Sequence, residues 1–491
     1  MPKYYLAAIS AVLLLSACEQ SSDQKKTQTH ETKPASLAIQ ASASEVSESE
    51  RVNAFFERAF EESAARYPEL LTSLGRKDRA DEWNDLSEEF ANESLEITKK
   101  QVAELKSFDR SKLDQASALS YDLLVQSMEQ EIKDNKWRLY NYPVNQMFGR
   151  HSDVVSLLIN QHRIDNIEDA KNYIARLNAV PALFDQLIAN IEARTAANII
   201  PPKFVFPHVI RDGKNIIKGA PFDDGEPSTL LADFTKKLTA LSKKEHKEEN
   251  KIEGSHLTDS NKVMLIDAAT LALSNSVKPA YQKLVAHLIE LETKATTDDG
   301  IWKWKDGDNF YNVALKRTTT TDLSSDQIHD IGLKEVERIH NEMRVIKDEV
   351  NFDGDLNAFM QFMREDDQFY HPNTDAGKAK YLSEATTLID DMRLKLDEMF
   401  ITQPKAELDV KAVEAFREQS AGKAFYERPS EDGTRPGLYY ANLFDMKAMP
   451  TYQMEALAYH EGIPGHHMQL AIQQELKDIP KFRKFGGYTA Y

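Results

Sequence analysis

The chain has 491 residues, of which 41% are hydrophobic and 29% charged, a balance typical of a globular protein with a sizeable core. Its length allows one large domain or two to three ordinary ones. The formal net charge of -18 would repel nucleic acid and anionic lipid, so we expect no nucleic-acid partner.

Residues 1–17 are predicted to be a signal peptide. Lys3 supplies a positive start, and the apolar run from Leu6 to Leu15 is too short to span a bilayer. Cys18 follows Leu-Ser-Ala and is the only cysteine of the chain, which excludes internal disulfides. The segment resembles a bacterial lipobox, and the resemblance implies cleavage before Cys18 and lipidation of its thiol. The alternative is a buried thiol inside an ordinary signal peptide.

Residues 18–48 are predicted to be a flexible tether between the lipidated cysteine and the folded body. They are rich in Ser, Gln, Thr, Glu, Lys and Ala and contain few large apolar residues that could repay the entropy of ordering. Glu19 and Gln20 do not resemble the usual inner-membrane retention signal. We therefore expect a lipid anchor in the outer membrane of a bacterial cell envelope, with the body facing the periplasm.

Residues 49–491 are predicted to form one mainly helical domain. Apolar residues recur at helical spacing in several segments: 52–60, 173–177, 184–191 and 281–289. Ser324 and Gln327 form a capping box that predicts a helix start. Strand-like segments are few: Lys203–Ile210, Phe310–Thr321 and Leu438–Phe444. The fold class is therefore mainly α, with a small β-sheet near the C-terminal third.

The candidate catalytic and metal-binding residues lie in one histidine-rich stretch. His460, Glu461, His466 and His467 fall within eight positions, interrupted by Gly462, Pro464 and Gly465. A zinc peptidase needs two neutral imidazoles, a third ligand and a carboxylate base, and the usual device is H-E-x-x-H on one helix. Here a straight helix would place His460 and His466 about 240° apart around its axis, which does not suit one metal.

The two glycines and the proline within the stretch allow a different backbone geometry. Pro464 cannot donate to the carbonyl of His460, and Gly462 and Gly465 allow backbone angles that other residues avoid. We predict a helix ending near Glu461, a widened turn, and a new helix from about His466. Such a turn would return one of the later histidines to the metal. The alternative is a helix–turn–helix corner with surface histidines.

The stretch AYHEGIPGHHMQ, residues 458–469, resembles the signature of the bacterial family known as domain of unknown function 885, grouped with gluzincin-like zinc metallopeptidases. Further segments resemble this family: 318–320, 328–333, 435–442 and 485–491. The resemblance spans roughly residues 50 to 491. It implies a multi-helix, zincin-like body that uses zinc as its cofactor.

The resemblance also assigns roles to residues. It implies His460 and His466 as zinc ligands and Glu461 as the general base, while His467 would support the ligands from behind or face the substrate. In gluzincins the third ligand is a glutamate about two dozen residues beyond the second histidine, at or just past residue 491. Glu475 and Asp478 are poor substitutes.

We therefore expect a C-terminally truncated chain that holds two of three ligands. Such a chain would bind zinc weakly, expose apolar surface and have little or no activity.

We expect a zinc-dependent hydrolase of the cell envelope that cleaves peptide bonds. The alternative is a non-catalytic envelope lipoprotein of the same fold that binds peptides or a protein partner, and metal content would separate the two. Tyr439 and Tyr440 are expected in the core of the sheet, although strands before such zinc helices commonly dock substrate backbone. Arg150 and His151 are expected to be structural. Tyr488 and Tyr491 are weaker candidates as donors to an oxyanion.

Overall fold

The structure is a computed structural model that describes residues 46–245 and 257–487, and the chain from Ser47 on forms one compact unit. The helices are α1 (Glu48–Arg66), α2 (Pro68–Ser73), α3 (Glu88–Leu105), α4 (Gln115–Asp134), α5 (Arg150–Asn160), α6 (Ile167–Ala196), α7 (Val205–Ile216), α8 (Thr229–Glu245), α9 (Asp259–Ala272), α10 (Lys278–Glu292), α11 (Gly307–Thr319), α12 (Ser325–Glu349), α13 (Leu356–Glu365), α14 (Asp375–Arg393), α15 (Thr451–Glu461), α16 (His466–Glu475) and α17 (Lys481–Phe485). The predicted signal peptide, Cys18 and most of the tether lie outside the described residues, as do Tyr488 and Tyr491.

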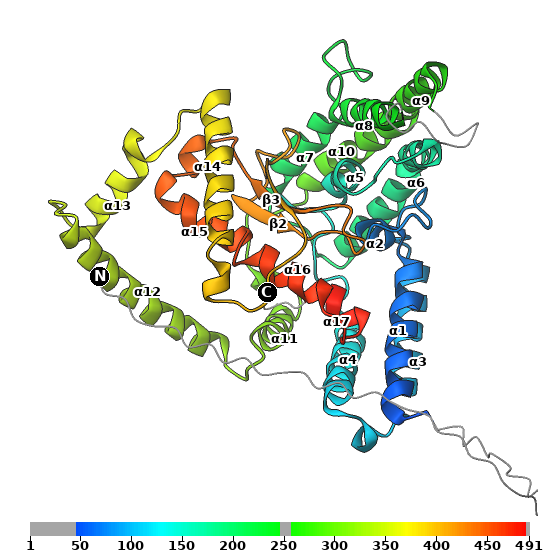
Figure 1. Cartoon of the computed structure of the whole chain (residues 1–491), viewed down its shortest axis with the longest axis horizontal. Helices are drawn as coiled ribbons and strands as arrows, with labels where there is room; N and C mark the ends of the chain where they lie inside the picture. The colour runs from blue at the N-terminus through cyan, green and yellow to red at the C-terminus, as the bar shows by residue number, and fades with distance from the viewer. Residues whose placement is uncertain (1–45, 246–256, 488–491) are drawn as a thin grey trace, which may run out of the picture. The chain divides into compact units, whose positions relative to one another are not determined.

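The predicted mainly α architecture with a small sheet is confirmed (Figure 1). The sheet consists of β1 (Leu408–Ala412), β2 (Ala424–Glu427) and β3 (Gly437–Ala441), in the order β1-β3-β2. β3 pairs in parallel with β1 and antiparallel with β2. It lies within the third predicted strand, so the sequence located the centre of the sheet.

The first predicted strand, Lys203–Ile210, is wrong, because most of it lies in α7. Val205, Phe206, Val209 and Ile210 are all buried, and their i, i+1, i+4, i+5 spacing places them on one face of a helix. Aromatic and β-branched residues favour strands only weakly. This preference is overridden when the segment can bury one face as a helix. Pro207 falls in the first turn of α7, where backbone N–H groups have no carbonyl partner within the helix. The N–H that proline lacks therefore costs the helix no hydrogen bond.

The second predicted strand, Phe310–Thr321, is also wrong, because it forms most of α11. The Phe310 ring contacts the rings of Trp137, Tyr140 and Trp304, with centroids 5.2–5.9 Å apart. Trp137 and Tyr140 come from a distant part of the sequence, and Trp304 lies six residues before Phe310. Tertiary packing of this aromatic cluster therefore overrides the strand preference of the four threonines at the end of the segment.

Two large hydrophobic cores organise the body. The larger lies mainly among α5 to α10, and the other gathers α14, α15, α16 and the sheet. α14 packs against β1 and α15, while α15 also packs against β2 (Figure 1). Tyr381, Ile389, Tyr439, Ala458 and Met468 belong to this second core. The histidine-rich stretch is thus held between a sheet and a long helix.

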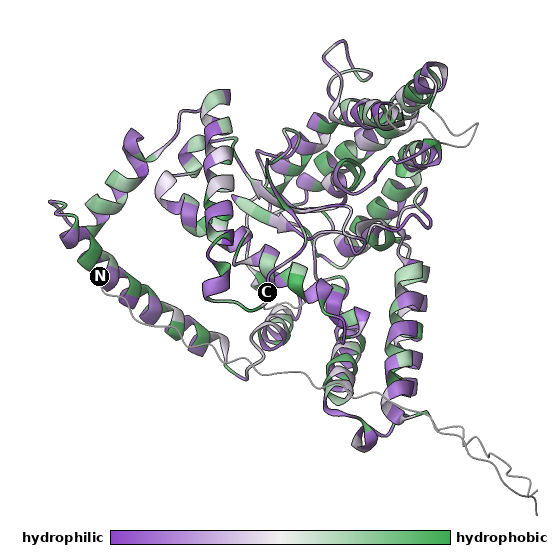
Figure 2. Ribbon diagram, in the orientation of Figure 1, coloured by the Kyte–Doolittle hydropathy of each residue, from purple (hydrophilic) through white to green (hydrophobic). Residues whose placement is uncertain are grey.

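The predicted start of α12 is confirmed, because Ser324 and Gln327 make both hydrogen bonds of the capping box. No residue of α12 is buried. Its exposed apolar side chains include Ile331, Val336 and Ile346. In Figure 2 hydrophobic and hydrophilic positions alternate along this helix.

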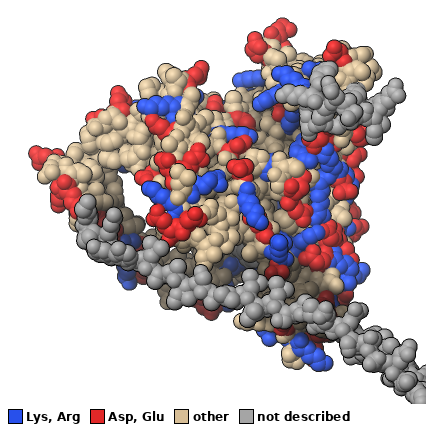
Figure 3. All heavy atoms as spheres, viewed as in Figure 1, with Lys and Arg blue, Asp and Glu red and all other residues tan. Residues whose placement is uncertain are grey.

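The charged side chains are spread over the surface. In the face shown in Figure 3, Lys and Arg lie interspersed with Asp and Glu. The excess of acidic residues is therefore not gathered into one patch on this face. Within the described ranges, no helix is long and apolar enough to cross a membrane.

Candidate metal centre

The histidine-rich stretch folds as helix, turn and helix, as predicted. α15 ends at Glu461 and α16 begins at His466. The N–H of Gly462 donates to the carbonyl of Ala458 at 2.9 Å and thus ends the first helix. The N–H of Gly465 then donates to the carbonyl of Tyr459 at 2.9 Å, which brings the chain back over the end of α15.

Gly465 is required because the turn passes so close to α15. A Cβ atom at this position would lie 1.9 Å from the carbonyl oxygen of His460 and 2.4 Å from that of Tyr459. Both neighbours are backbone atoms that cannot move independently of the helix. The return of the chain towards His460 therefore depends on the missing side chain of Gly465.

The turn brings His460 and His466 together. Their ring centroids lie 4.6 Å apart and the rings are inclined at 81°. Two imidazoles bound to one tetrahedral zinc at about 2.1 Å hold their centroids about 5 Å apart, so the pair fits two positions of such a site. Partial burial, and then the nearby His460, lowers the pKa of His466 and favours the neutral form that binds metal.

Glu461 lies at the end of α15 and is 5% exposed. Its Oε2 atom is buried and has no hydrogen-bond partner among the described residues. Burial raises the pKa of this carboxyl group above its ordinary value, while His460 opposes the rise. A buried carboxylate with an unused oxygen and an increased affinity for protons is suited to accept a proton.

Tyr439 of β3 lies within electrostatic reach of this carboxylate, a relation that the sequence did not reveal. Its hydroxyl is buried without a hydrogen-bond partner in the described part of the chain. Burial, the adjacent Tyr381 and the charge of Glu461 all raise the pKa of Tyr439. The phenol therefore stays protonated. The expected core position of Tyr439 and Tyr440 is confirmed, since they are 0% and 1% exposed.

His467 is buried in the fold and faces other partners than His460. Its Nε2–H donates to the carbonyl of Ala406 at 3.0 Å, and its Nδ1 accepts from the hydroxyl of Tyr426 at 3.0 Å. Burial lowers its pKa to about 4. Both ring nitrogens are thus engaged in hydrogen bonds. His467 anchors α16 to β2, and the Tyr426 ring also stacks on His466 with centroids 6.4 Å apart.

The donor set is incomplete in the described residues. Across residues 46–245 and 257–487, no three His, Cys, Asp or Glu side chains converge to hold a metal. Glu475 accepts hydrogen bonds from the N–H groups of Lys405 at 2.7 Å and Ala406 at 3.2 Å. The residues present therefore fit zinc in two positions of a three-ligand site.

The sheet leaves only its outer strands for a substrate backbone. β3 lies between β1 and β2, so both of its edges are paired. Docking of a peptide on β3 itself, which the sequence left open, is therefore not possible. The structural interpretation of Arg150 and His151 fits their contacts: Arg150 forms an ion pair with Glu69, and His151 is 2% exposed.

Comparisons with known proteins agree on the fold. A family model described as "Bacterial protein of unknown function (DUF885)" matches residues 68–491. A crystal structure described as "the putative lipoprotein from Colwellia psychrerythraea" is 25% identical in sequence and matches with a TM-score of 0.77. That match covers 90% of this chain and 75% of that chain. A comparison with curated proteins finds no match.

Proposed function

The chain belongs to the bacterial DUF885 family, and from that premise we propose that it is a zinc-dependent hydrolase of the cell envelope that cleaves peptide bonds. The observation that carries the proposal is the approach of His460 and His466 to a centroid distance of 4.6 Å beside the buried carboxylate of Glu461. Two imidazoles and a carboxylate base are three of the parts that metal-assisted hydrolysis requires, and a third protein ligand is the fourth.

Each residue of the site would have its own role in hydrolysis. His460 and His466 would hold the zinc, which when bound would polarise the scissile carbonyl. Glu461 would accept a proton from the attacking water and deliver it to the departing amine. The anchoring of His467 by Tyr426 and Ala406 would keep α16 fixed, so that His466 stays directed at His460.

A peptide substrate would pair with β2, an outer strand of the sheet. Its residue Tyr426 contacts both His466 and His467, so this strand passes beside the candidate metal centre. Backbone pairing with an edge strand is a common way to hold an extended peptide. It would place a scissile bond near the imidazoles whatever the side chains of the substrate.

The cell-envelope location rests on the resemblance of the N-terminal segment to a lipobox and on the name of the Colwellia protein. Lipidation of Cys18 would anchor the body to the outer membrane, facing the periplasm. The second candidate function is a lipoprotein of the same fold that binds peptides or a protein partner without catalysis. This second candidate is favoured because the described residues supply only two donors for a metal, and a catalytic zinc site needs three.

The experiment combines metal binding with turnover. We expect His460→Ala and His466→Ala each to lower zinc affinity at least about tenfold in calorimetric titration, because each removes a donor. His329→Ala on the exposed helix α12 is the matched control and should leave affinity unchanged. If His467→Ala lowers the affinity and His466→Ala does not, the ligand assignment is wrong by one position.

Glu461→Gln tests whether Glu461 is the general base. The substitution keeps the shape of the side chain, so we expect zinc affinity to survive. Hydrolysis of a mixed peptide library should fall at least about 10²-fold, in line with general-base effects. Unchanged hydrolysis would remove Glu461 from the mechanism. A metal-free protein that is folded and binds peptides without cleaving them would support the second candidate.

A further inference from the structure

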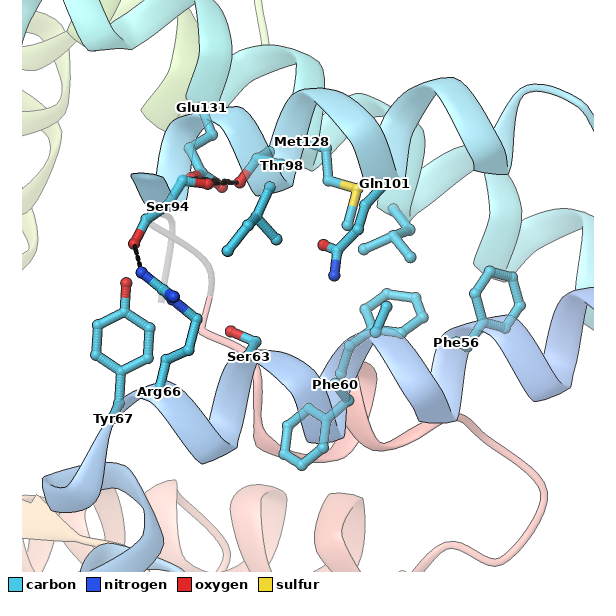
Figure 4. Close-up of a pocket in the computed structure, with 14 residues that line it drawn as sticks. Phe56, Phe60, Ser63, Arg66, Tyr67, Ser94, Thr98, Gln101, Met128 and Glu131 are labelled. Carbon is cyan, nitrogen blue, oxygen red and sulfur yellow. Dashed lines mark hydrogen bonds between the residues drawn. The ribbon is translucent and has the colours of Figure 1, made fainter. Parts of the chain in front are cut away.

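A cavity of about 250 Å³ lies between α1, α3, α4 and α17. Figure 4 shows that its two ends differ in chemistry. The rings of Phe56 and Phe60 lie at one end, and Arg66, Ser94 and Glu131 lie at the other. Phe482 of α17 completes the apolar lining. An apolar cavity with a few convergent polar groups is the usual form of a small-molecule site.

The polar end holds two opposite charges that are kept apart. Arg66 Nη2 donates to the hydroxyl of Ser94 at 3.2 Å. The Thr98 hydroxyl lies 3.1 Å from the carbonyl of Ser94 and 3.1 Å from Glu131 Oε1. This hydroxyl has one proton and can donate to only one of them at a time. Ser94 and Thr98 therefore separate the guanidinium from the carboxylate.

Neither charge is fully satisfied by the protein. Arg66 Nε is buried and has no hydrogen-bond partner among the residues described. Arg66 forms an ion pair with Glu93 at 3.5 Å, but the Glu93 side chain is 69% exposed, so the pair contributes little. The guanidinium also lies over the Phe90 ring, 4.4 Å from its centroid, a contact that leaves its N–H groups free to donate. Within the same ranges the exposed side chain of Glu131 forms no ion pair, and its hydrogen bond comes from Thr98. A donor and an acceptor thus both remain available at this end.

We propose that this cavity binds a free α-amino acid with an aromatic or branched apolar side chain. Its carboxylate would contact Arg66, its ammonium group would contact Glu131, and its side chain would pack on Phe56 and Phe60. A fatty acid would satisfy Arg66 alone, and an amine would satisfy Glu131 alone. The site is independent of the proposed hydrolase centre, because His460, Glu461 and His466 do not line it.

Calorimetric titration of the full chain with four probes tests the ligand class. We expect L-phenylalanine to bind at least about tenfold more tightly than 3-phenylpropanoate, 2-phenylethylamine or glycine. Each of these three lacks one charged group or the apolar side chain. A chelator is present throughout. Failure of L-phenylalanine to bind at millimolar concentration would overturn the proposal, as would equal or tighter binding of 3-phenylpropanoate.

Variants with matched controls test the location. Arg66→Gln and Glu131→Gln should each weaken L-phenylalanine binding at least about tenfold. Arg58→Gln on α1 and Glu129→Gln on α4 change charges outside the cavity and should have no effect. Ser63→Phe blocks the cavity from an exposed lining position without removing an internal contact, and should abolish binding even if Arg66→Gln fails to fold.

His466→Ala separates this proposal from the proposed function. Binding of L-phenylalanine should persist in this variant, whatever happens to zinc affinity or hydrolysis. Loss of binding in His466→Ala, or unchanged binding in Ser63→Phe, would mean that the amino acid occupies another site. Either result would overturn the assignment.

Discussion

Arg176 is fully buried and has no carboxylate partner within ion-pair distance among the described residues. It instead donates to three acceptors: the carbonyl of Glu82 at 2.9 Å, the hydroxyl of Thr72 at 2.7 Å and Nδ1 of His162 at 3.1 Å. Nε2 of His162 donates to the carbonyl of Asp169 at 2.9 Å. The hydrogen bond from Arg176 requires His162 to be neutral, because a protonated imidazole has no acceptor.

This network predicts a loss of stability in acid. Burial, and then the charge of Arg176, lowers the pKa of His162 from an ordinary value of 6.5 to about 3. Below pH 6.5 the unfolded chain binds a proton that the folded chain does not, so stability falls as the pH drops from 6.5 towards 3. The slope from this group is about 1.4 kcal/mol per pH unit, or about 2 kcal/mol between pH 6.5 and 5.

Urea unfolding at pH 7.5 and pH 5 measures the effect. His162→Gln should be less stable than the parent at pH 7.5, because it disturbs a buried network. Its further loss on going to pH 5 should be smaller than the parent's by about 2 kcal/mol. His329→Gln on exposed α12 should keep the parent's pH dependence. An identical pH dependence in His162→Gln and the parent would contradict the prediction.

The candidate site shows which residues a sequence can identify. His460, Glu461 and His466 could be predicted because the turn that joins them is local and its glycines and proline are visible. The partners of His467 could not be predicted, because Ala406 and Tyr426 lie 61 and 41 residues away. The same holds for Tyr439 within electrostatic reach of Glu461, since only the packing of the sheet against α15 brings them together.

At the scale of elements, α15 and α16 depend on the turn between them. Gly465→Ala should destabilise the protein by roughly 1–3 kcal/mol, the usual cost of overpacking, because the new Cβ would meet the carbonyl of His460. It should also lower zinc affinity if His460 and His466 share the metal. Thermal unfolding and zinc titration of the same variant measure both effects.

Gly332→Ala is the matched control for this substitution. Gly332 lies in the exposed helix α12 and a Cβ there would meet nothing within 4 Å. We expect this change to stabilise the helix by about 0.5–1 kcal/mol, because alanine loses less backbone entropy than glycine. Equal effects of the two substitutions would mean that the turn tolerates a side chain.

The errors in α7 and α11 have a common physical cause. Their sequences contain the aromatic and β-branched residues that strands favour, and short apolar runs fit either structure. Partners distant in sequence decided the outcome, such as the aromatic rings of Trp137 and Tyr140 beside Phe310. Long amphipathic segments such as α1 and α10 were predictable because their periodicity is a property of the segment alone.

At the scale of the whole molecule, the anchor is the feature to test. Cys18→Ala should abolish labelling by a radioactive fatty acid, because its thiol is the predicted acceptor, and should release the body from the membrane fraction. Ser21→Ala, three positions further on, is the control and should leave labelling intact. Undiminished labelling of Cys18→Ala would contradict the assignment.

The first and last described helices pack together. The rings of Phe56 in α1 and Phe482 in α17 have centroids 5.5 Å apart. The N–H of Lys481 donates to Glu57 at 3.1 Å, across 424 residues of sequence. During synthesis α1 therefore leaves the ribosome long before α17 exists to cover it. This contact can form only after the last described helix has been synthesised, whereas the larger core among α5 to α10 joins residues that are closer in sequence and can pack earlier.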